Sequence, residues 1–555
     1  MRDSPRVLVI GIDGATFDLI DRWIEQGRLP NLSRLIRDGV RGPLRSTVIP
    51  NSFPAWTSCV TGVNPAKHGI FKPLIRKDIH SYGMQVLSSR DVREKCLWQI
   101  LSEHGKRVGV VNVPPFYPAM PVNGFFIGGM LSPGLESDFT YPSGLIQEII
   151  AHTGEYIIDI KSKTGPKEKM RDDLLRSVVK RSEAARYLMR KQDWDFFMIV
   201  FTETDRVQHY FWADMDPTHP AHDPQRAARL GSAIFDVYNQ VDKAVGELLQ
   251  EIDSNTQVII VSDHGFGPQP FSFYINRWLQ ERGLLHLRGR QELSQQLKAI
   301  AREALAFANL LDLAKQGRER LRSNSNHNHA GELNGLNFKR SVIDDLIACI
   351  DWPRTLVYSL VPRGIRINLR GREPQGIVEP GRQYDELREH IKRELTQLKY
   401  PETGERVFET VLFREECLFG PMLKFAPDII TVMSIGVPSC SIDSESLFEI
   451  NRGATGSHTE YGVFIAAGAG IKQGERISGA SIMDITPTAL YSMRVPLGEN
   501  MDGKVLREIF SGDFLAAREI KYQAALAATS VAEAPYTEDE EKRIMEKLIS
   551  LGYIS

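Results

Sequence analysis

The chain has 555 residues, enough for one large α/β domain with insertions or for two to four domains of ordinary size. Hydrophobic residues make up 42% and charged residues 25%, values typical of a globular protein that can bury a substantial core. The net charge of −2 argues against a general nucleic-acid binder, which usually carries a basic excess, but it leaves a small anionic substrate open.

Five nearly continuous apolar runs are typical of strands buried on both faces, as in a parallel sheet covered by helices. These runs span residues 6–13, 107–113, 195–205, 256–265 and 461–471. Helical patterns separate them, and the one at 232–252 places its aliphatic residues along one side. The alternation predicts an α/β fold, a three-layer α/β/α sandwich with a mostly parallel central sheet.

The pattern changes after about residue 276. Basic helices are expected over 288–322 and a polar loop over 324–335, and buried-strand character returns at 427–433. The expected division is a first core part at 1–275, an inserted cap at 276–420, a second core part at 421–510 and a C-terminal helical tail at 511–555. We expect the cap to set substrate specificity, because it would overhang the strand ends.

The end of the tail carries the signals of a capped helix. Thr537 and Glu540 have the spacing of a capping box. The apolar stripe that follows consists of Ile544, Leu548 and Leu551, and Gly552 suits the position just beyond a helix.

The five cysteines are scattered and form no C-x-x-C pair, which indicates free thiols in a reducing compartment. The first apolar run is short and ends at Asp13, without the cleavage site of a signal peptide. No apolar run approaches the roughly 20 residues that span a bilayer. These features predict a soluble, cytoplasmic protein and leave its oligomeric state open.

Acidic and histidine side chains follow three of the predicted strands, and a further histidine precedes another. They are Asp13, Asp205, His209, Asp263, His264 and His458. Ligands of parallel sheets bind beyond the carboxyl ends of the strands, so these side chains are expected to converge. A mixture of carboxylates and imidazoles suits Zn²⁺ or Mn²⁺ rather than Ca²⁺.

Each of these signals is weak alone, because a D-x-x-x-H spacing such as Asp205–His209 is common by chance, although one helical turn would put both on one face. Together the six groups suffice for two divalent metal ions with three protein ligands each. Two such ions could clamp the attacking and leaving oxygens of an in-line displacement at phosphorus or, less often, sulfur.

The proline-rich segment 47–71 offers hydroxyl groups as nucleophiles. The candidates are Thr47, Ser52, Thr57, Ser58 and Thr61. Thr57, Ser58 and Thr61 are expected to have a structural role, in packing and capping within a helix that starts near Pro54. Ser52, just before that helix, could be an N-cap, a position that also favours bound phosphate.

Several motifs, taken together, resemble the alkaline phosphatase superfamily. They are VLVIGIDG, NSFPAWTSCVTGVNPAKHGIF, TETDRVQHYFW, VSDHGFGP and GSHTEYGVFIAAGAGI, with a similar closing motif at 483–506. Within the superfamily, the chain is most similar to the type I phosphodiesterase/nucleotide pyrophosphatase family. The resemblance implies an alkaline phosphatase-like fold and two divalent metal ions, most readily Zn²⁺.

The resemblance also implies roles for individual residues. One metal ion would be held by Asp205, His209 and His458, and the other by Asp13, Asp263 and His264 together with the nucleophile. In this family the nucleophile is a Thr or Ser two residues before a proline, which here is Ser52 in Ser-Phe-Pro. The implied function is hydrolysis of a small phosphodiester through a covalent phospho-serine intermediate.

The segment after the nucleophile departs from the family pattern. The nucleotide pyrophosphatases have an Asp-Asn pair soon after HGI, whereas this chain has Phe71-Lys72-Pro73. Lys72 could replace the charge stabilisation of the missing Asn or be a solvated surface lysine, and Lys67 could also supply positive charge. His68 is expected to be structural.

Other functions remain open. A phosphomonoesterase or a phosphonate-ester hydrolase would use the same fold, and a phosphomutase would need a different serine segment. A sulfatase would need an Arg where this chain has Trp56. A non-catalytic metal-binding module would be expected to lack some of the ligands, all of which are present.

Overall fold

The computed structural model describes residues 4–550, except 77, 161–164, 290–341, 402, 443 and 526–535. Apart from residues 288 and 289, the basic helices expected over 288–322 and the polar loop at 324–335 lie outside the described residues. Leu551 and Gly552, expected to end the last helix, lie outside them too.

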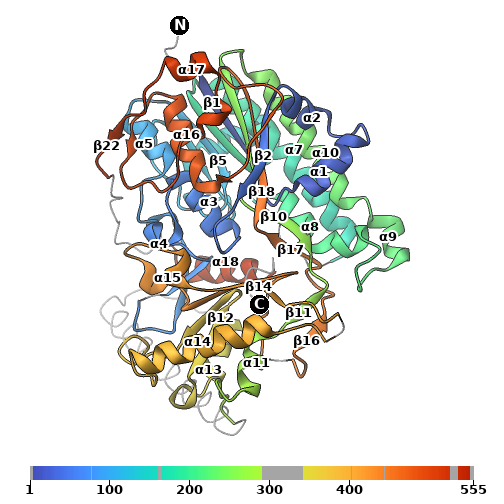
Figure 1. Ribbon diagram of the computed structural model, residues 1–555. Helices are drawn as coiled ribbons and strands as arrows, with labels where there is room; N and C mark the ends of the chain where they lie inside the picture. Colours follow the sequence, from blue (N-terminus) through green and yellow to red (C-terminus); the bar gives the residue numbers. More distant parts are fainter. Residues whose placement is uncertain are drawn as a thin grey trace, which may run out of the picture.

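A large sheet forms the centre of the molecule (Figure 1). Its parallel middle has the order β9 (Thr256–Val261), β1 (Arg6–Ile12), β8 (Phe196–Phe201), β5 (Val108–Val113) and β6 (Gly124–Gly128). β18 (Tyr461–Gly468) adds antiparallel to β9 and leads to β2 (Gly39–Arg45). The edges are completed by β7 (Thr140–Tyr141), β19 (Glu475–Arg476) and β20 (Ala480–Ser481).

Helices cover both faces of this sheet (Figure 1). One layer contains α1 (Phe17–Glu25), α2 (Pro30–Arg37), α7 (Lys167–Lys191), α8 (Glu203–Met215) and α10 (Ala233–Leu248). The other contains α3 (Ser52–Thr61), α5 (Leu97–Glu103) and α16 (Ile485–Ser492). The predicted α/β sandwich with a mainly parallel sheet is confirmed.

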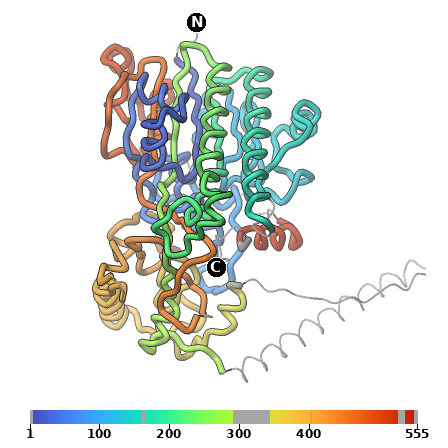
Figure 2. Tube along the Cα trace, turned by 90° about the vertical axis from the view of Figure 1, so that its right-hand side faces the viewer, coloured from blue at the N-terminus to red at the C-terminus, as the bar shows by residue number. Residues whose placement is uncertain are grey.

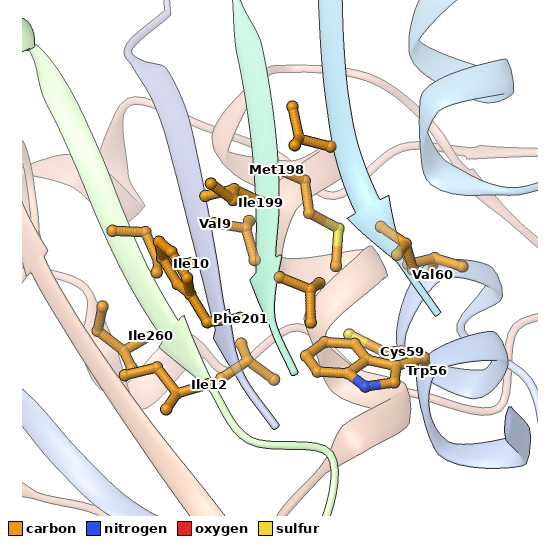
Figure 3. Close-up of a cluster of buried hydrophobic side chains, with 14 of the residues drawn as sticks. Val9, Ile10, Ile12, Trp56, Cys59, Val60, Met198, Ile199, Phe201 and Ile260 are labelled. Atoms are coloured by element: carbon orange, nitrogen blue, oxygen red, sulfur yellow. The ribbon is translucent and has the colours of Figure 1, made fainter. Parts of the chain in front are cut away.

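The core lies between these layers. All residues of β8 and β9 are buried, as are those of β1 after Arg6, because side chains on both faces of the central strands meet helices. Figure 3 shows Trp56 and Cys59 of α3 packed near the lower ends of these strands, among Ile12, Phe201 and their neighbours. The helix that begins at Ser52 is therefore packed directly against the sheet.

A smaller antiparallel sheet forms the cap. Its order is β12 (Val357–Val361), β13 (Gly364–Ile367), β15 (Ile429–Met433) and β14 (Phe408–Phe413). This sheet has a hydrophobic core of its own, to which α14 (Arg382–Gln397) and α11 (Ile275–Glu281) contribute. The cap lies below the carboxyl ends of the large sheet in both views (Figures 1 and 2).

The strand at 427–433, expected to reopen the core, is β15 of this smaller sheet. Its burial comes from the cap's own hydrophobic core, to which Ile429 and Met433 belong. A run of buried apolar residues does not specify which sheet a strand joins. The large sheet is rejoined only at β18, after β16 (Phe448–Ile450) and β17 (Gly456–Thr459).

Shorter elements connect these parts. The helices are α4 (Pro65–His68), α6 (Leu145–Thr153), α9 (Pro224–Leu230), α13 (Val342–Cys349), α15 (Arg414–Cys417) and α17 (Gly512–Ala516). The strands are β3 (Leu74–Arg76), β4 (Met84–Val86), β10 (Gly265–Pro268), β11 (Phe271–Phe273), β21 (Leu497–Gly498) and β22 (Tyr522–Gln523). β10 pairs with β17 and β11 with β16, so the two crossings between core and cap run side by side.

The last helix, α18 (Glu538–Ser550), begins with the predicted capping box. Glu540 accepts hydrogen bonds from the amide and hydroxyl of Thr537, and Thr537 accepts one from the amide of Glu540. Ile544 and Leu548 are buried, as the stripe predicts. Within the described ranges, no helix combines the length and apolarity that crossing a bilayer requires.

Candidate metal centre and active site

Six candidate ligands converge beyond the carboxyl ends of three neighbouring parallel strands. Asp13 follows β1, Asp205 and His209 lie on α8 after β8, and Asp263 and His264 follow β9. His458 comes from β17, which pairs with β10 next to His264. The sheet order β9-β1-β8 thus places side chains far apart in sequence at one edge.

Asp205, His209 and His458 form a first cluster. The Oδ1 atom of Asp205 lies 3.4 Å from His209 Nε2 and 3.1 Å from His458 Nε2, and the two Nε2 atoms lie 2.9 Å apart. Asp205 and His209 are one turn apart on α8, so both reach the same point, as their spacing predicts.

Asp13, Asp263 and His264 form a second cluster. His264 Nε2 lies 3.2 Å from Asp263 Oδ2 and 3.7 Å from Asp13 Oδ1. The amide of Gly14 donates to Asp263 Oδ1 at 3.2 Å, while the buried Oδ2 of Asp263 accepts no hydrogen bond from any residue that the structure describes. Gly14 has a φ of 67°, and a Cβ there would lie 2.9 Å from the Phe266 ring, so this approach favours glycine.

The two clusters are adjacent. Ligand atoms of His264, Asp205 and His458 lie within 4.8 Å of one another, and so do those of His264, Asp13 and Asp263. The rings of His264 and His458 stack with centroids 3.8 Å apart. The resemblance divides the six residues into two sets of three, and the structure places His264 within reach of both sets.

The three imidazoles share one hydrogen-bond pattern. Each Nδ1 lies within 3.1 Å of a backbone carbonyl oxygen: Gly456 for His209, Gly265 for His264 and Pro50 for His458. A carbonyl only accepts, so Nδ1 carries the proton, and in the neutral ring Nε2 presents its lone pair to the carboxylates. Two such Nε2 atoms 2.9 Å apart repel each other unless a cation lies between them. This donor set fits a divalent metal centre.

The electrostatics of the cluster fit the same conclusion. Burial, followed by the charges of Asp263 and Asp205, raises the pKa of Asp13 well above its ordinary value. Burial and then Asp205 raise the pKa of Asp263 to about 8. Crowded, desolvated carboxylates of this kind are stabilised by bound cations.

Burial also favours neutral imidazoles here. It lowers the pKa of His458 against the opposing effect of Asp205. Burial, followed by the neighbouring His458, lowers the pKa of His264 well below its ordinary value. Neutral rings with free Nε2 lone pairs are the form that binds metals.

Ser52 lies at the first position of α3, beside the second cluster. Its Oγ is 3.3 Å from both Asp13 Oδ1 and His264 Nε2, and the residue is fully buried. The helix starts at Ser52 rather than near Pro54, because Asn51 is its N-cap and accepts a hydrogen bond from the amide of Phe53. The hydroxyl of Ser52 is therefore free of a capping role.

The other hydroxyls of the segment are occupied elsewhere. Thr57 and Thr61 donate to carbonyls one turn earlier, and Thr47 donates to Ile49. Ser58 lies 2.9 Å from His68 Nε2, and burial lowers the pKa of His68 to about 3. His68 is thus a buried, neutral packing residue, in agreement with its expected structural role.

Several contacting residues were not predicted. Trp56 Nε1 donates to Asp13 Oδ2 at 2.9 Å, and Arg206 Nη1 donates to Asp205 Oδ2 at 2.7 Å. Arg363 of the cap donates to the carbonyl of His458 at 2.9 Å. Trp56 and Arg206 lie within the same motifs as Ser52 and Asp205. Their closeness in sequence to these residues could have indicated that they contact the site. Arg363 comes from a separate sheet, and no sequence pattern connects it to the site.

The two candidate lysines differ. Lys67 forms an ion pair with Asp502 at 2.5 Å and donates to the carbonyl of Asn500. Lys72 instead lines a cavity of about 630 Å³ that adjoins the site and is also lined by His209, Ser457 and His458. Lys72 is half-buried, so it is not a solvated surface residue.

Comparison with known proteins identifies the family and agrees with the fold. The sequence profile of the type I phosphodiesterase / nucleotide pyrophosphatase family matches residues 7–456. The chain therefore belongs to this family, and the resemblance noted from its motifs is confirmed. No curated protein sequence matches the chain.

Solved structures share the fold at low sequence identity. Phosphonoacetate hydrolase from Sinorhizobium meliloti 1021, in complex with phosphonoacetate, matches with a TM-score of 0.52 and 15% identity, over 88% of this chain and 96% of its own. A mutant of alkaline phosphatase PafA matches with a TM-score of 0.51 and 13% identity, over 92% and 100%. Both similarities show an alkaline phosphatase-like fold.

Proposed function

We propose that the protein is a two-metal hydrolase of small phosphodiesters in which Ser52 is the nucleophile. The observation that carries this proposal is the position of Ser52 Oγ, 3.3 Å from Asp13 and from His264, beside a buried set of carboxylates and imidazoles. Family membership supports the reaction class.

In this proposal, Asp205, His209 and His458 hold one divalent ion. Asp13, Asp263 and His264 hold the other, next to Ser52. Zn²⁺ suits the mixed donors best, and Mn²⁺ is the alternative. Bound there, the two ions would supply positive charge to the phosphoryl oxygens and Lewis acidity toward the attacking and leaving oxygens.

The protein's own groups position the nucleophile. The Ser52 hydroxyl is within reach of Asp13 as a proton acceptor, and it stands at the N-terminus of α3, where a phosphoryl group is favoured. In the first step an Oγ–P bond forms while the bond to the leaving alcohol breaks, and that alcohol takes up a proton. Water then cleaves the Oγ–P bond, which restores Ser52 and releases a phosphomonoester.

The cavity favours a diester over a monoester. Its volume of about 630 Å³ beside His209 and His458 leaves room for a second ester group. A sulfatase is disfavoured, because Trp56 is fully buried and bonded to Asp13 where an Arg would be needed. A non-catalytic module is disfavoured by the convergence of every ligand with Ser52.

The test is a Ser52→Ala variant assayed on bis(p-nitrophenyl) phosphate, with bound metal quantified in parallel. Turnover should fall at least about 1,000-fold, while about two equivalents of Zn²⁺ or Mn²⁺ remain bound. Ser58→Ala is the matched control, since Ser58 lies on the same helix but contacts His68. Near-normal turnover by Ser52→Ala would disprove the assignment.

A panel of monoesters, diesters and phosphonate esters with several metals tests the substrate class separately. The proposal predicts a preference for diesters with Zn²⁺ or Mn²⁺. A strong preference for monoesters would replace the phosphodiesterase assignment with a phosphomonoesterase of the same fold.

A further inference from the structure

The cavity beside the site extends from the candidate ligands into the cap. Pro50, Ser457 and His458 line the side near the metal clusters. Leu360, Val437 and Phe425 are among the many apolar residues that line the rest. A cavity of about 630 Å³ is larger than phosphate needs and accommodates a small organic molecule.

Cations outnumber carboxylates in its lining. The basic residues are Lys72, Arg76, Arg93, Arg363 and Arg366, and the acidic residue is Asp91. Asp91 already accepts hydrogen bonds from the amide and hydroxyl of Ser88, at 2.8 and 2.7 Å. The chain as a whole carries a net charge of −2, so this positive charge is a local feature of the cavity.

Two of these cations share one carboxylate of the cap. Arg76 Nη2 lies 2.6 Å from Glu373 Oε2, and Arg366 Nη1 lies 3.3 Å from Glu373 Oε1. Arg366 also donates to the carbonyl of Phe425. These contacts fix both guanidinium groups, so their structural role is accounted for without a ligand.

Lys72 has no such partner. It makes no hydrogen bond or ion pair with any residue in the part of the chain that the structure describes, although it is half-buried. Burial, followed by the charges of Arg366 and Arg76, lowers the pKa of Lys72 well below its ordinary value. A partly desolvated ammonium group among like charges is costly, and an anionic ligand group would offset that cost.

Arg363 also lines this cavity. Its side chain is buried and donates to the carbonyl of His458, and no carboxylate within the described residues pairs with it. Its φ of 66° lies in the left-handed region, which non-glycine residues rarely adopt. Positive charge therefore occurs both beside the metal clusters and within the cap, with apolar lining also present in the cavity.

We propose that Lys72 binds a second anionic group, a carboxylate or a phosphate, on the part of the substrate that lies away from the reacting phosphorus. The substrate class is then a phosphoester with an apolar segment that ends in a second anion. This inference rests on the proposed function, which places the reacting phosphoryl group beside Ser52 and the metal ligands. The ion pair with Lys72 would select these bifunctional anions over phosphoesters whose far end is neutral.

The experiment measures binding, so it does not depend on turnover. Zn²⁺-loaded protein is titrated calorimetrically with three probe series of equal chain length: alkylphosphonates, ω-carboxyalkylphosphonates and alkyl-α,ω-bisphosphonates. Each series is measured with wild type, Lys72→Met and Lys243→Met. The Met variant keeps the apolar stem of Lys72, and Lys243 is an exposed lysine on α10 outside the cavity, so its variant controls for the charge change.

Wild type should bind at least one bifunctional series about 10–100-fold more tightly than the alkylphosphonates. Lys72→Met should abolish that advantage and leave alkylphosphonate affinity unchanged, while Lys243→Met should change neither. The tighter series identifies the second anion as carboxylate or phosphate. If the advantage is absent in wild type, or survives in Lys72→Met, the inference is wrong. Failure of the proposed function would appear separately, as absent hydrolysis despite intact Lys72-dependent binding.

Discussion

Trp56 Nε1 donates a 2.9 Å hydrogen bond to Asp13 Oδ2, which ties the helix that carries Ser52 to the carboxyl end of β1. Ser52 and Trp56 are one helical turn apart on α3, so both face Asp13. Asp13 Oδ1 lies 3.3 Å from Ser52, so one carboxylate contacts both residues. Beneath Trp56, Gly11 leaves the space the ring needs, since a Cβ there would lie 2.5 Å from Trp56 Cη2.

Replacing Trp56 with Phe tests this anchor. The ring would still fill the core, but Asp13 would lose a buried hydrogen bond, so the free energy of unfolding should fall by about 1–3 kcal/mol. Turnover should fall as well, because Ser52 loses its fixed relation to Asp13. Urea unfolding and diesterase assays measure the two effects.

The matched control is Trp98→Phe. Trp98 is equally buried, but its Nε1 donates to the sulfur of Met120, at 3.3 Å, instead of to a carboxylate. This variant should lose less stability than Trp56→Phe and keep its activity. Equal losses of stability and activity in the two variants would show that the hydrogen bond to Asp13 does not position Ser52.

Arg206 is predicted to orient Asp205 for metal binding. Its Nη1 lies 2.7 Å from Asp205 Oδ2 and its Nη2 lies 3.3 Å from Asp159, all within the buried interior. Lys547 of α18 lies 3.6 Å from the same Asp159 oxygen, so the last helix contacts this network. Arg206→Met should lower metal affinity about 10–100-fold, as measured by competition with a chelator.

Arg181→Met provides the comparison for Arg206. Arg181 is just as buried and pairs with Glu203, but it does not contact Asp205. Its loss should reduce stability and leave metal affinity nearly unchanged. The positioning role of Arg206 would be refuted if both variants changed metal affinity equally.

The cap has its own pH-dependent ion pair. Asp428 accepts hydrogen bonds from Arg372 at 2.6 and 2.7 Å and from Tyr384 at 2.7 Å. Burial would raise the pKa of Asp428, but Arg372 outweighs it and holds that pKa well below the ordinary value. A lowered aspartate pKa stabilises the fold fully above about pH 4 and loses that contribution as the pH falls.

Asp428→Asn should therefore destabilise the protein by about 3–5 kcal/mol at pH 7, because the buried Arg372 loses the carboxylate that both of its terminal nitrogens contact and keeps only Glu373. The difference between variant and wild type should shrink as the pH falls below about 4. Urea unfolding of both proteins at pH 7, 5 and 3.5 measures this difference. The control is Glu379→Gln, which removes an exposed ion pair with Arg370. A difference independent of pH would contradict the ionic role of Asp428.

The sequence was most informative where physical pattern and motif coincide. Unbroken apolar runs predicted the central strands, and acids just beyond them predicted a convergence that the structure contains. The helical spacing of Asp205 and His209 predicted their shared position. These features are local, because they depend on strand ends and on one helical turn.

The parts that could not be predicted depend on contacts between distant segments. Asn51 rather than Ser52 caps α3, because the choice between two adjacent polar residues depends on backbone geometry. The strand at 427–433 joins the cap sheet, and Arg363 reaches His458 from that sheet. Neither contact produces a periodic pattern in the sequence from which it could be predicted. The sharing of His264 between two clusters likewise arises only from packing.

Ser52 is the group proposed to attack phosphorus. The most direct measurement is rapid acid quenching of the enzyme during turnover of a chromogenic phosphodiester, followed by mass spectrometry of the peptide that contains Ser52. The account predicts a covalent adduct with the mass of the transferred phosphoester on Ser52, absent in Ser52→Ala and present in Ser58→Ala. An active enzyme that carries the adduct on another residue, or that never accumulates one while Ser52→Ala retains turnover, would contradict it.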